Sequence, residues 1–156
     1  YKGGSYSQGS ALYGGIGLLL EKGGNDNYST TGYYSQGCSF DAAFGLLLDV
    51  DGKDSYIGEE YCQACTSHNG LSALIDLAGS DSYKAKEMSQ AEIGTSGEHW
   101  EEDWPSIAIL ADFGEDRNVI SGTGRNEGSN YWKNCIAFLT MKKSYADAIK
   151  EALKIE

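Results

Sequence analysis

The chain has 156 residues, a formal net charge of −11 at pH 7, 21 glycines and one proline. That length suits one domain with room for a core. The acidic balance argues against nucleic acid and anionic membranes as partners, because their phosphates would repel the chain. It is compatible with cations, basic proteins or neutral glycans. No apolar run approaches the roughly 20 residues that a membrane-spanning helix needs.

One unit recurs along the chain with a period of about 27 to 28 residues, a length typical of stacked repeats. Aligned on the acid that ends an apolar run, its copies carry Glu21, Asp49, Asp76 and Asp112, with Thr140 in a degenerate fifth copy. The intervals between these positions are nearly equal except for the third, from Asp76 to Asp112, which is longer. A fixed period of this size indicates a stack of repeated structural units.

Three further positions of the unit recur with the same period, and we call each set of equivalent residues a column. These columns are a second acid at Asp26, Asp54, Asp81 and Asp116, a tyrosine at Tyr28, Tyr56 and Tyr83, and a glutamine at Gln8, Gln36, Gln63 and Gln90. Each unit is also rich in glycine and tyrosine. No unit shows a sustained 3.6-residue apolar stripe, which argues against helical repeats. A unit of this length suits three short strands joined by turns, stacked on the next unit about 4.8 Å away. The sequence therefore predicts an all-β fold, a parallel β-helix or β-solenoid of about five coils over residues 1–143.

The first residue falls on the tyrosine column, in the middle of a unit. We therefore expect the natural protein to continue upstream with more coils. An open parallel sheet edge at this end would be a place to add another strand or another chain.

The apolar strands have two apolar faces. Each unit contains one apolar run of five residues, and we expect the first, third and fifth residues of this run to face the interior. The first residues are Ile16, Phe44, Leu71, Ile107 and Cys135. The other face alternates a small residue with a large one, and its large residues are Leu19, Leu47, Leu74, Leu110 and Phe138. Parallel strands that are apolar on both faces are usually covered on both. We therefore expect this second, outer stripe to be an interface with a neighbouring domain, a second chain or a returning tail.

Nine extra residues separate the third and fourth acids, in the stretch 92–105. This insertion holds His99, Trp100, Glu101, Asp103 and Trp104. Insertions in stacked repeats form loops on one face, and two tryptophans among carboxylates suit a sugar ring or a bound cation. Paired carboxylates could also act as acid and base on a glycosidic bond. The simpler alternative is a solvated acidic loop that its tryptophans anchor to the stack.

The last residues, 144–156, break the repeat. Ser144 and Asp147 resemble a capping box, and Tyr145, Ile149 and Leu153 share one helical face. The sequence predicts a C-terminal capping α-helix here.

The column of Asp26, Asp54 and Asp81 raises an electrostatic question. Unit charges about 4.8 Å apart repel by roughly 1 kcal/mol in water, and by several times more in a protein interior. Either each carboxylate accepts turn amides, or the column binds calcium, which prefers carboxylate and carbonyl oxygens. The stretch Gly23 to Tyr28 resembles a fragment of the calcium-binding nonapeptide repeats of secreted β-rolls. No other cofactor is expected.

Three features have structural interpretations that compete with functional ones. Stacked glutamine amides and tyrosine rings can hydrogen-bond and fill space along the stack, although a solvent-facing tyrosine ladder could bind sugar. Cys38 and Cys65 should be neighbours on adjacent coils, either as buried free thiols or as a disulfide. A zinc site is disfavoured because Cys62 and Cys65 point to opposite faces of a strand.

The architecture implied for residues 1–143 resembles, in repeat length, the coils of extracellular polysaccharide lyases and surface adhesins. The basic catalytic groups of those lyases have no matching motif here, where Arg117 and Arg125 are the only arginines. We therefore expect a non-enzymatic structural or binding module of a larger secreted or surface protein. The alternative is a fragment of a glycan-active enzyme, a lyase or hydrolase, that uses the 92–105 loop.

Overall fold

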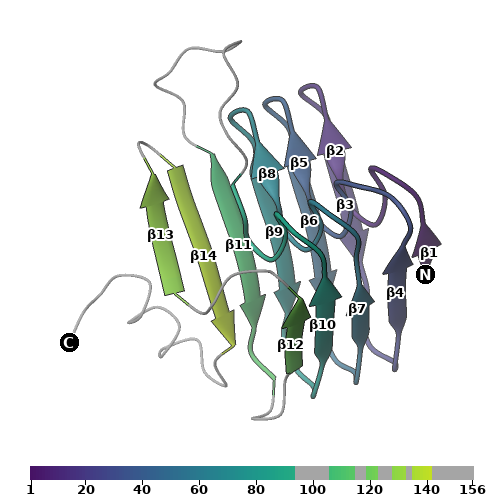
Figure 1. The fold of residues 1–156 in the computed structure, drawn as a ribbon. Helices are drawn as coiled ribbons and strands as arrows, with labels where there is room; N and C mark the ends of the chain where they lie inside the picture. The colour runs from purple at the N-terminus through teal and green to yellow at the C-terminus, as the bar shows by residue number, and fades with distance from the viewer. Residues whose placement is uncertain (94–105, 115–118, 123–127, 133–134, 142–156) are drawn as a thin grey trace.

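The computed structural model describes residues 1–93, 106–114, 119–122, 128–132 and 135–141, and beyond residue 114 it describes only the path of the backbone (Figure 1). The described residues form an all-β structure with parallel sheets and contain no helix. Within them, therefore, no helix reaches the length and apolar character needed to cross a membrane.

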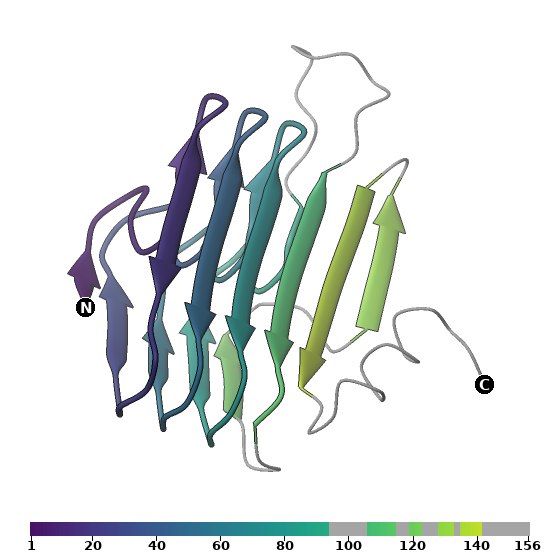
Figure 2. The same cartoon turned by 180° about the vertical axis from the view of Figure 1, so that it is seen from behind.

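Three sheets make up the fold. The five-stranded sheet has the order β1 (Lys2–Gly3), β4 (Asn27–Thr30), β7 (Ser55–Ile57), β10 (Ser82–Ala85) and β12 (Val119–Gly122). The six-stranded sheet has the order β13 (Gly128–Trp132), β14 (Cys135–Met141), β11 (Ile107–Asp112), β9 (Leu71–Asp76), β6 (Phe44–Asp49) and β3 (Ile16–Leu20), seen face-on in Figure 2. The three-stranded sheet contains β2 (Ala11–Leu12), β5 (Ser39–Phe40) and β8 (Thr66–Ser67).

The chain visits these sheets in a fixed rotation. From β2 through β10 it passes from the three-stranded sheet to the six-stranded sheet, then to the five-stranded sheet, and starts again. Positions one period apart pair in parallel, so that Leu47 lies between Leu19 and Leu74, and Tyr56 lies between Tyr28 and Tyr83. This is the register that the sequence predicts for these columns.

The core lies between the six-stranded and five-stranded sheets. Its largest buried members are three tyrosines and three leucines, Tyr28, Tyr56, Tyr83, Leu47, Leu74 and Leu110. The tyrosine rings stack with centroids 4.8 Å apart for Tyr28 and Tyr56 and 4.7 Å apart for Tyr56 and Tyr83. The phenol column thus fills the interior, and its rings do not form a strip on the surface.

The sequence-based assignment of inner and outer faces is wrong. Leu47, Leu74 and Leu110 are fully buried, whereas Ile16 and Leu18, predicted to be interior, are 74% and 56% exposed. The predicted interface stripe of Leu19, Leu47, Leu74, Leu110 and Phe138 is therefore corrected. Its three central leucines belong to the core, and Leu19 packs against that core at the edge. The side chain of Phe138 lies outside the described residues.

The small residues of each strand explain this inversion. A Cβ atom on Gly17 would lie 2.1 Å from the carbonyl oxygen of Ser10, and one on Gly45 would lie 2.1 Å from that of Cys38. The incoming segment of the chain therefore crosses the inner face of the sheet at close range. At these two positions only glycine fits, and the equivalent positions on β9 and β11 carry the small residues Ser72 and Ala108. The face that alternates small and large residues is therefore the inner one.

The last two strands depart from the predicted columns. Asp112 pairs with Met141 rather than with Thr140, and Ile107 pairs with Ile136 rather than with Cys135. The sequence-based alignment of the fifth unit with the fourth is therefore shifted by one residue from the pairing in the structure. In addition, β13 pairs with β14 in the antiparallel direction, which ends the parallel order of the six-stranded sheet. The capping helix predicted for 144–156 lies outside the described residues.

Candidate metal centre

Two columns of acidic side chains face each other at the turn between the six-stranded and five-stranded sheets. One column stands where the strands of the six-stranded sheet end, at Glu21, Asp49 and Asp76. The other precedes the strands of the five-stranded sheet, at Asp26, Asp54 and Asp81. Because each turn between them is short, the segments 21–26, 49–54 and 76–81 each bring one acid of each kind to the same gap.

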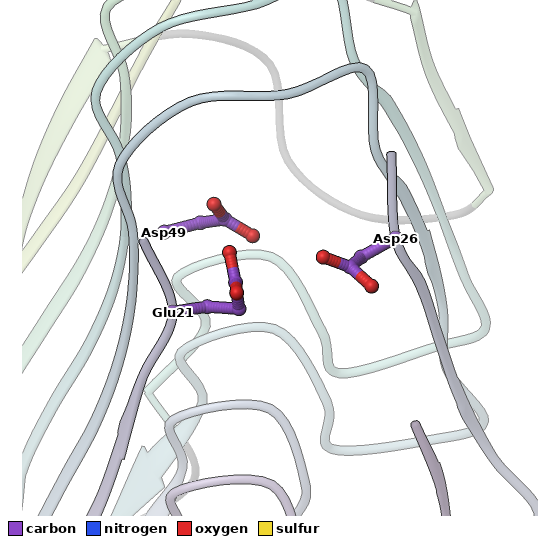
Figure 3. A group of neighbouring side chains, drawn as sticks. All are labelled: Glu21, Asp26 and Asp49. Carbon is purple, nitrogen blue, oxygen red and sulfur yellow. The ribbon is translucent and has the colours of Figure 1, made fainter. Parts of the chain in front are cut away.

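The first cluster, which we call the edge triad, is Glu21, Asp26 and Asp49. One carboxylate oxygen from each lies within 4.8 Å of the others. Glu21 and Asp26 are half-buried, and Asp49 is fully buried. Figure 3 shows the Asp26 carboxylate pointing from the residue before β4 toward the carboxylates of Glu21 and Asp49 on the opposite side.

The second cluster, the central triad, is Asp54, Asp76 and Asp81. Its ligand atoms also lie within 4.8 Å of one another. All three residues are buried, with exposed fractions of 3%, 0% and 2%. The two triads therefore differ in their access to solvent and share the same chemistry.

Tyrosine hydroxyls from the core hold one acid of each triad. Tyr28 donates a hydrogen bond to Oδ2 of Asp49 at 2.6 Å, and Tyr56 donates to Oδ2 of Asp76 at 2.7 Å. The Oδ1 atom of Asp49 is buried and has no hydrogen-bond partner among the described residues. The phenol column thus fixes each carboxylate by one oxygen and leaves Asp49 with a buried acceptor to satisfy.

Backbone amides hold the other column. The amide of Asp26 donates to Oδ1 of Asp54 at 2.6 Å, and the amide of Asp54 donates to Oδ1 of Asp81 at 2.7 Å. These bonds are the amide contacts that the sequence suggested, but each joins adjacent units instead of closing its own turn. Oδ2 of Asp54 remains buried without a hydrogen bond in the described structure.

Burial makes these carboxyl groups reluctant to ionise. Desolvation raises the pKa of Asp76 to about 8, of Asp81 to about 7 and of Asp54 to about 6, and neighbouring carboxylates raise each of them further. Desolvation also raises the pKa of Asp49, against the lowering effect of its bond from Tyr28. Burial and the nearby carboxylates also raise the pKa of the Tyr28 and Tyr56 hydroxyls. Both hydroxyls therefore keep their protons and remain hydrogen-bond donors.

Among the described residues, no ion pair involves Glu21, Asp26, Asp49, Asp54 or Asp76. The ion pairs there join Lys86 to Glu59 and His68 to Asp41, and neither pair includes a member of the two triads. Protons or a bound cation can therefore neutralise these five acids. All the available ligand atoms are oxygens, which suits hard cations of the calcium type better than zinc or copper.

The sequence named half of these acids as candidate metal ligands. It proposed Asp26, Asp54 and Asp81 as one metal-binding column, and the structure divides them between two clusters. Glu21, Asp49 and Asp76 form a repeated acid in the sequence, which by itself indicates no role for them. The turn of only four residues between Glu21 and Asp26 was the signal that the two columns would meet.

The glutamine column is structural. Nε2 of Gln36 donates to the carbonyls of Tyr28 and Ile57, and Nε2 of Gln63 donates to those of Tyr56 and Lys84. A direct bond between stacked amides joins Gln90 to Gln63 at 3.1 Å. Each side chain thus ties two neighbouring strands of the five-stranded sheet together.

The remaining predicted sites divide into two groups. Cys38, Cys62 and Cys65 are buried free thiols, as the sequence suggested, and the alternative Cys38–Cys65 disulfide is absent. The amide of Cys65 donates to the Cys38 sulfur at 3.1 Å. The predicted ligand-binding residues His99, Trp100, Glu101, Asp103 and Trp104 lie outside the described residues.

Comparisons with protein-family models, with curated proteins and with solved structures find no match to this chain.

Proposed function

We propose that this chain is a β-solenoid module with a structural and binding role, part of a larger secreted or surface protein. The observation that supports it best is the use of the buried polar side chains. The hydrogen bonds that Tyr56 and Gln63 donate hold adjacent units together. A catalytic group must reach a substrate, whereas these groups are fully buried.

The winding of the chain supports the solenoid. Three successive segments each place one strand in every sheet, and their equivalent residues pair in register. Such a stack gains stability from every neighbour that a unit acquires. In a solenoid, each column described above would continue for as long as units are added.

The binding role is proposed for the open end formed by β1, β2 and β3. Leu18 and Leu20 on β3 are 56% and 63% exposed, while their equivalents Leu46 and Leu48, one strand further in, are half-buried. Tyr1 stacks on Tyr28 with centroids 4.9 Å apart, the same arrangement as inside the column. The occupant that fits this end is a further parallel β-segment carrying the same columns.

Adding one unit tests both parts of this proposal. A copy of residues 28–55 is placed before Tyr1, which brings Tyr1 to the position that Tyr56 has in the chain. We expect a higher melting temperature and an unchanged β-sheet content per residue, because the new unit covers β3. The control carries the same added segment with its residues in scrambled order. An added unit that is digested by protease and leaves the melting temperature unchanged overturns the proposal.

An activity assay on polysaccharides distinguishes the proposed role from the alternative, a glycan-active enzyme. The full chain is incubated with a panel of acidic and neutral polysaccharides, and new reducing ends and unsaturated products are measured. The proposed role predicts no turnover. Turnover that Glu101→Gln or Asp103→Asn abolishes would replace it with the enzymatic function.

A further inference from the structure

We propose that the gap between the two acid columns binds calcium ions, one in the edge triad and one in the central triad, and that these ions fasten adjacent units together. The proposal goes beyond the structural role, and its test uses the unmodified chain. It would hold even if no further β-segment binds to the open end.

The dimensions of each triad fit one ion. Calcium binds oxygens at about 2.3–2.6 Å, so two ligands on opposite sides of it are at most about 5 Å apart. The ligand atoms of both triads lie within 4.8 Å of one another. Three carboxylates also supply up to six oxygens, close to the six to eight that calcium takes.

An acidic cluster alone would not identify a site, because exposed acids often gather without a ligand. The deciding observation is one buried, unsatisfied oxygen in each triad. Oδ1 of Asp49 and Oδ2 of Asp54 have no hydrogen-bond donor among the described residues, and their residues are 0% and 3% exposed. A buried acceptor without a donor is costly, so both oxygens require a partner.

The held oxygens indicate how such a site is prepared. Tyr28 fixes Asp49 through Oδ2, and the amide of Asp26 fixes Asp54 through Oδ1. In both residues the bonded oxygen is thus distinct from the unsatisfied one. The carboxylates are oriented before a cation arrives, which lowers the entropy lost on binding.

Each ion would join residues from different units. In the edge triad, Glu21 and Asp49 lie at the ends of neighbouring strands of the six-stranded sheet, and Asp26 comes from the opposite sheet. In the central triad, Asp54 and Asp81 directly precede neighbouring strands of the five-stranded sheet, while Asp76 comes from the six-stranded sheet. A cation in either triad would therefore resist separation of the units and of the two sheets.

The test compares melting temperatures of the full chain in EDTA, in calcium and in magnesium, with ionic strength held equal by NaCl. We expect calcium to raise the melting temperature in proportion to the logarithm of its concentration above the dissociation constant. Magnesium should act more weakly, because it needs compact octahedral geometry and keeps several waters that the buried central triad excludes. Equal melting temperatures in EDTA and in calcium overturn the proposal, whether or not any variant folds.

Variants locate the ions. Asp49→Asn and Asp54→Asn each remove one charge and keep an oxygen for the bond from Tyr28 or from the Asp26 amide. We expect each to lose part of the calcium-dependent stabilisation, and the double variant to lose all of it. Asp51→Asn, an exposed acid in the same turn, is the matched control and should respond as the unaltered chain does.

Terbium supplies a readout that does not depend on stability. It occupies calcium sites, and its emission is sensitised by nearby tyrosines such as Tyr28 and Tyr56. We expect emission under tyrosine excitation that calcium displaces and that the double variant lacks. Emission of equal strength in the double variant would assign the binding to surface acids and overturn the proposed sites.

Discussion

The open edge of the stack and its centre carry the same residues in different surroundings. Leu19 and Leu74 share a column, yet the first is half-buried and the second fully buried. The same contrast separates the edge triad from the central triad. Burial and electrostatics in this fold therefore depend on how many neighbouring units a residue has, and the residue type does not decide them alone. The predictions below test this contrast.

The largest effect is expected from pH, in a chelator, through the central triad. Asp54, Asp76 and Asp81 bind protons more tightly in the folded state, with pKa values of about 6, 8 and 7, than the unfolded chain does near pH 4. The stability that their protonated forms contribute is present below pH 4 and is lost as the pH rises to about 8. Urea titrations across this range should show that decline.

Asp76→Asn sharpens the pH experiment because it removes the group with the highest of the three pKa values. The variant should lose less stability between pH 6 and 8 than the unaltered chain, while Asp51→Asn should follow the unaltered chain. A free energy of unfolding that rises with pH over this interval in EDTA would contradict the assignment of buried, protonated carboxyl groups to the central triad.

The next effect compares two leucines of one column. Leu74→Ala creates a cavity in the core and should lower the free energy of unfolding by about 2–5 kcal/mol. Leu19→Ala should cost clearly less, because this side chain has a neighbouring unit on one side only. Chemical denaturation of both variants in calcium measures the difference. Equal losses would show that the edge is as well packed as the centre.

A smaller effect is expected from the glutamine column. Gln63→Leu leaves the carbonyls of Tyr56 and Lys84 without their side-chain donor and should cost about 1–3 kcal/mol. Gln8 makes equivalent bonds to Tyr1 and Ser29 at the edge, where water can replace them. Gln8→Leu should therefore cost less, as measured by thermal or chemical unfolding.

The smallest effect is expected on the surface. Glu59→Gln removes the ion pair with Lys86, whose side chain is 61% exposed. Because solvent and salt screen such pairs, we expect no measurable change in melting temperature at physiological ionic strength. A clearly lower melting temperature would mean that this exposed pair also holds adjacent units together, a role that we assign to the buried groups.

The repeat by itself predicted the all-β structure and its parallel sheets. The spacing of Asp49 and Asp76 predicted the parallel register, and the length of the unit predicted three short strands. This succeeded because equivalent residues in a stack must lie above one another wherever the backbone hydrogen bonds are in register. The sequence misaligns the fifth unit by one residue because Met141 stands where the earlier units have an acid, which leaves no marker for the register.

Tertiary structure alone decided which face of each strand is buried and which acids meet. Because side chains alternate along a strand, Leu46 and Leu47 point to opposite faces of β6. The alternation does not say which of them is inside when both faces are apolar. The close crossing of the chain over Gly45 made that choice. Likewise, the sequence places Asp49 and Asp26 in separate columns, and only the fold of the turn between the two sheets brings their carboxylates together, because distance in space is set by that turn and not by the repeat.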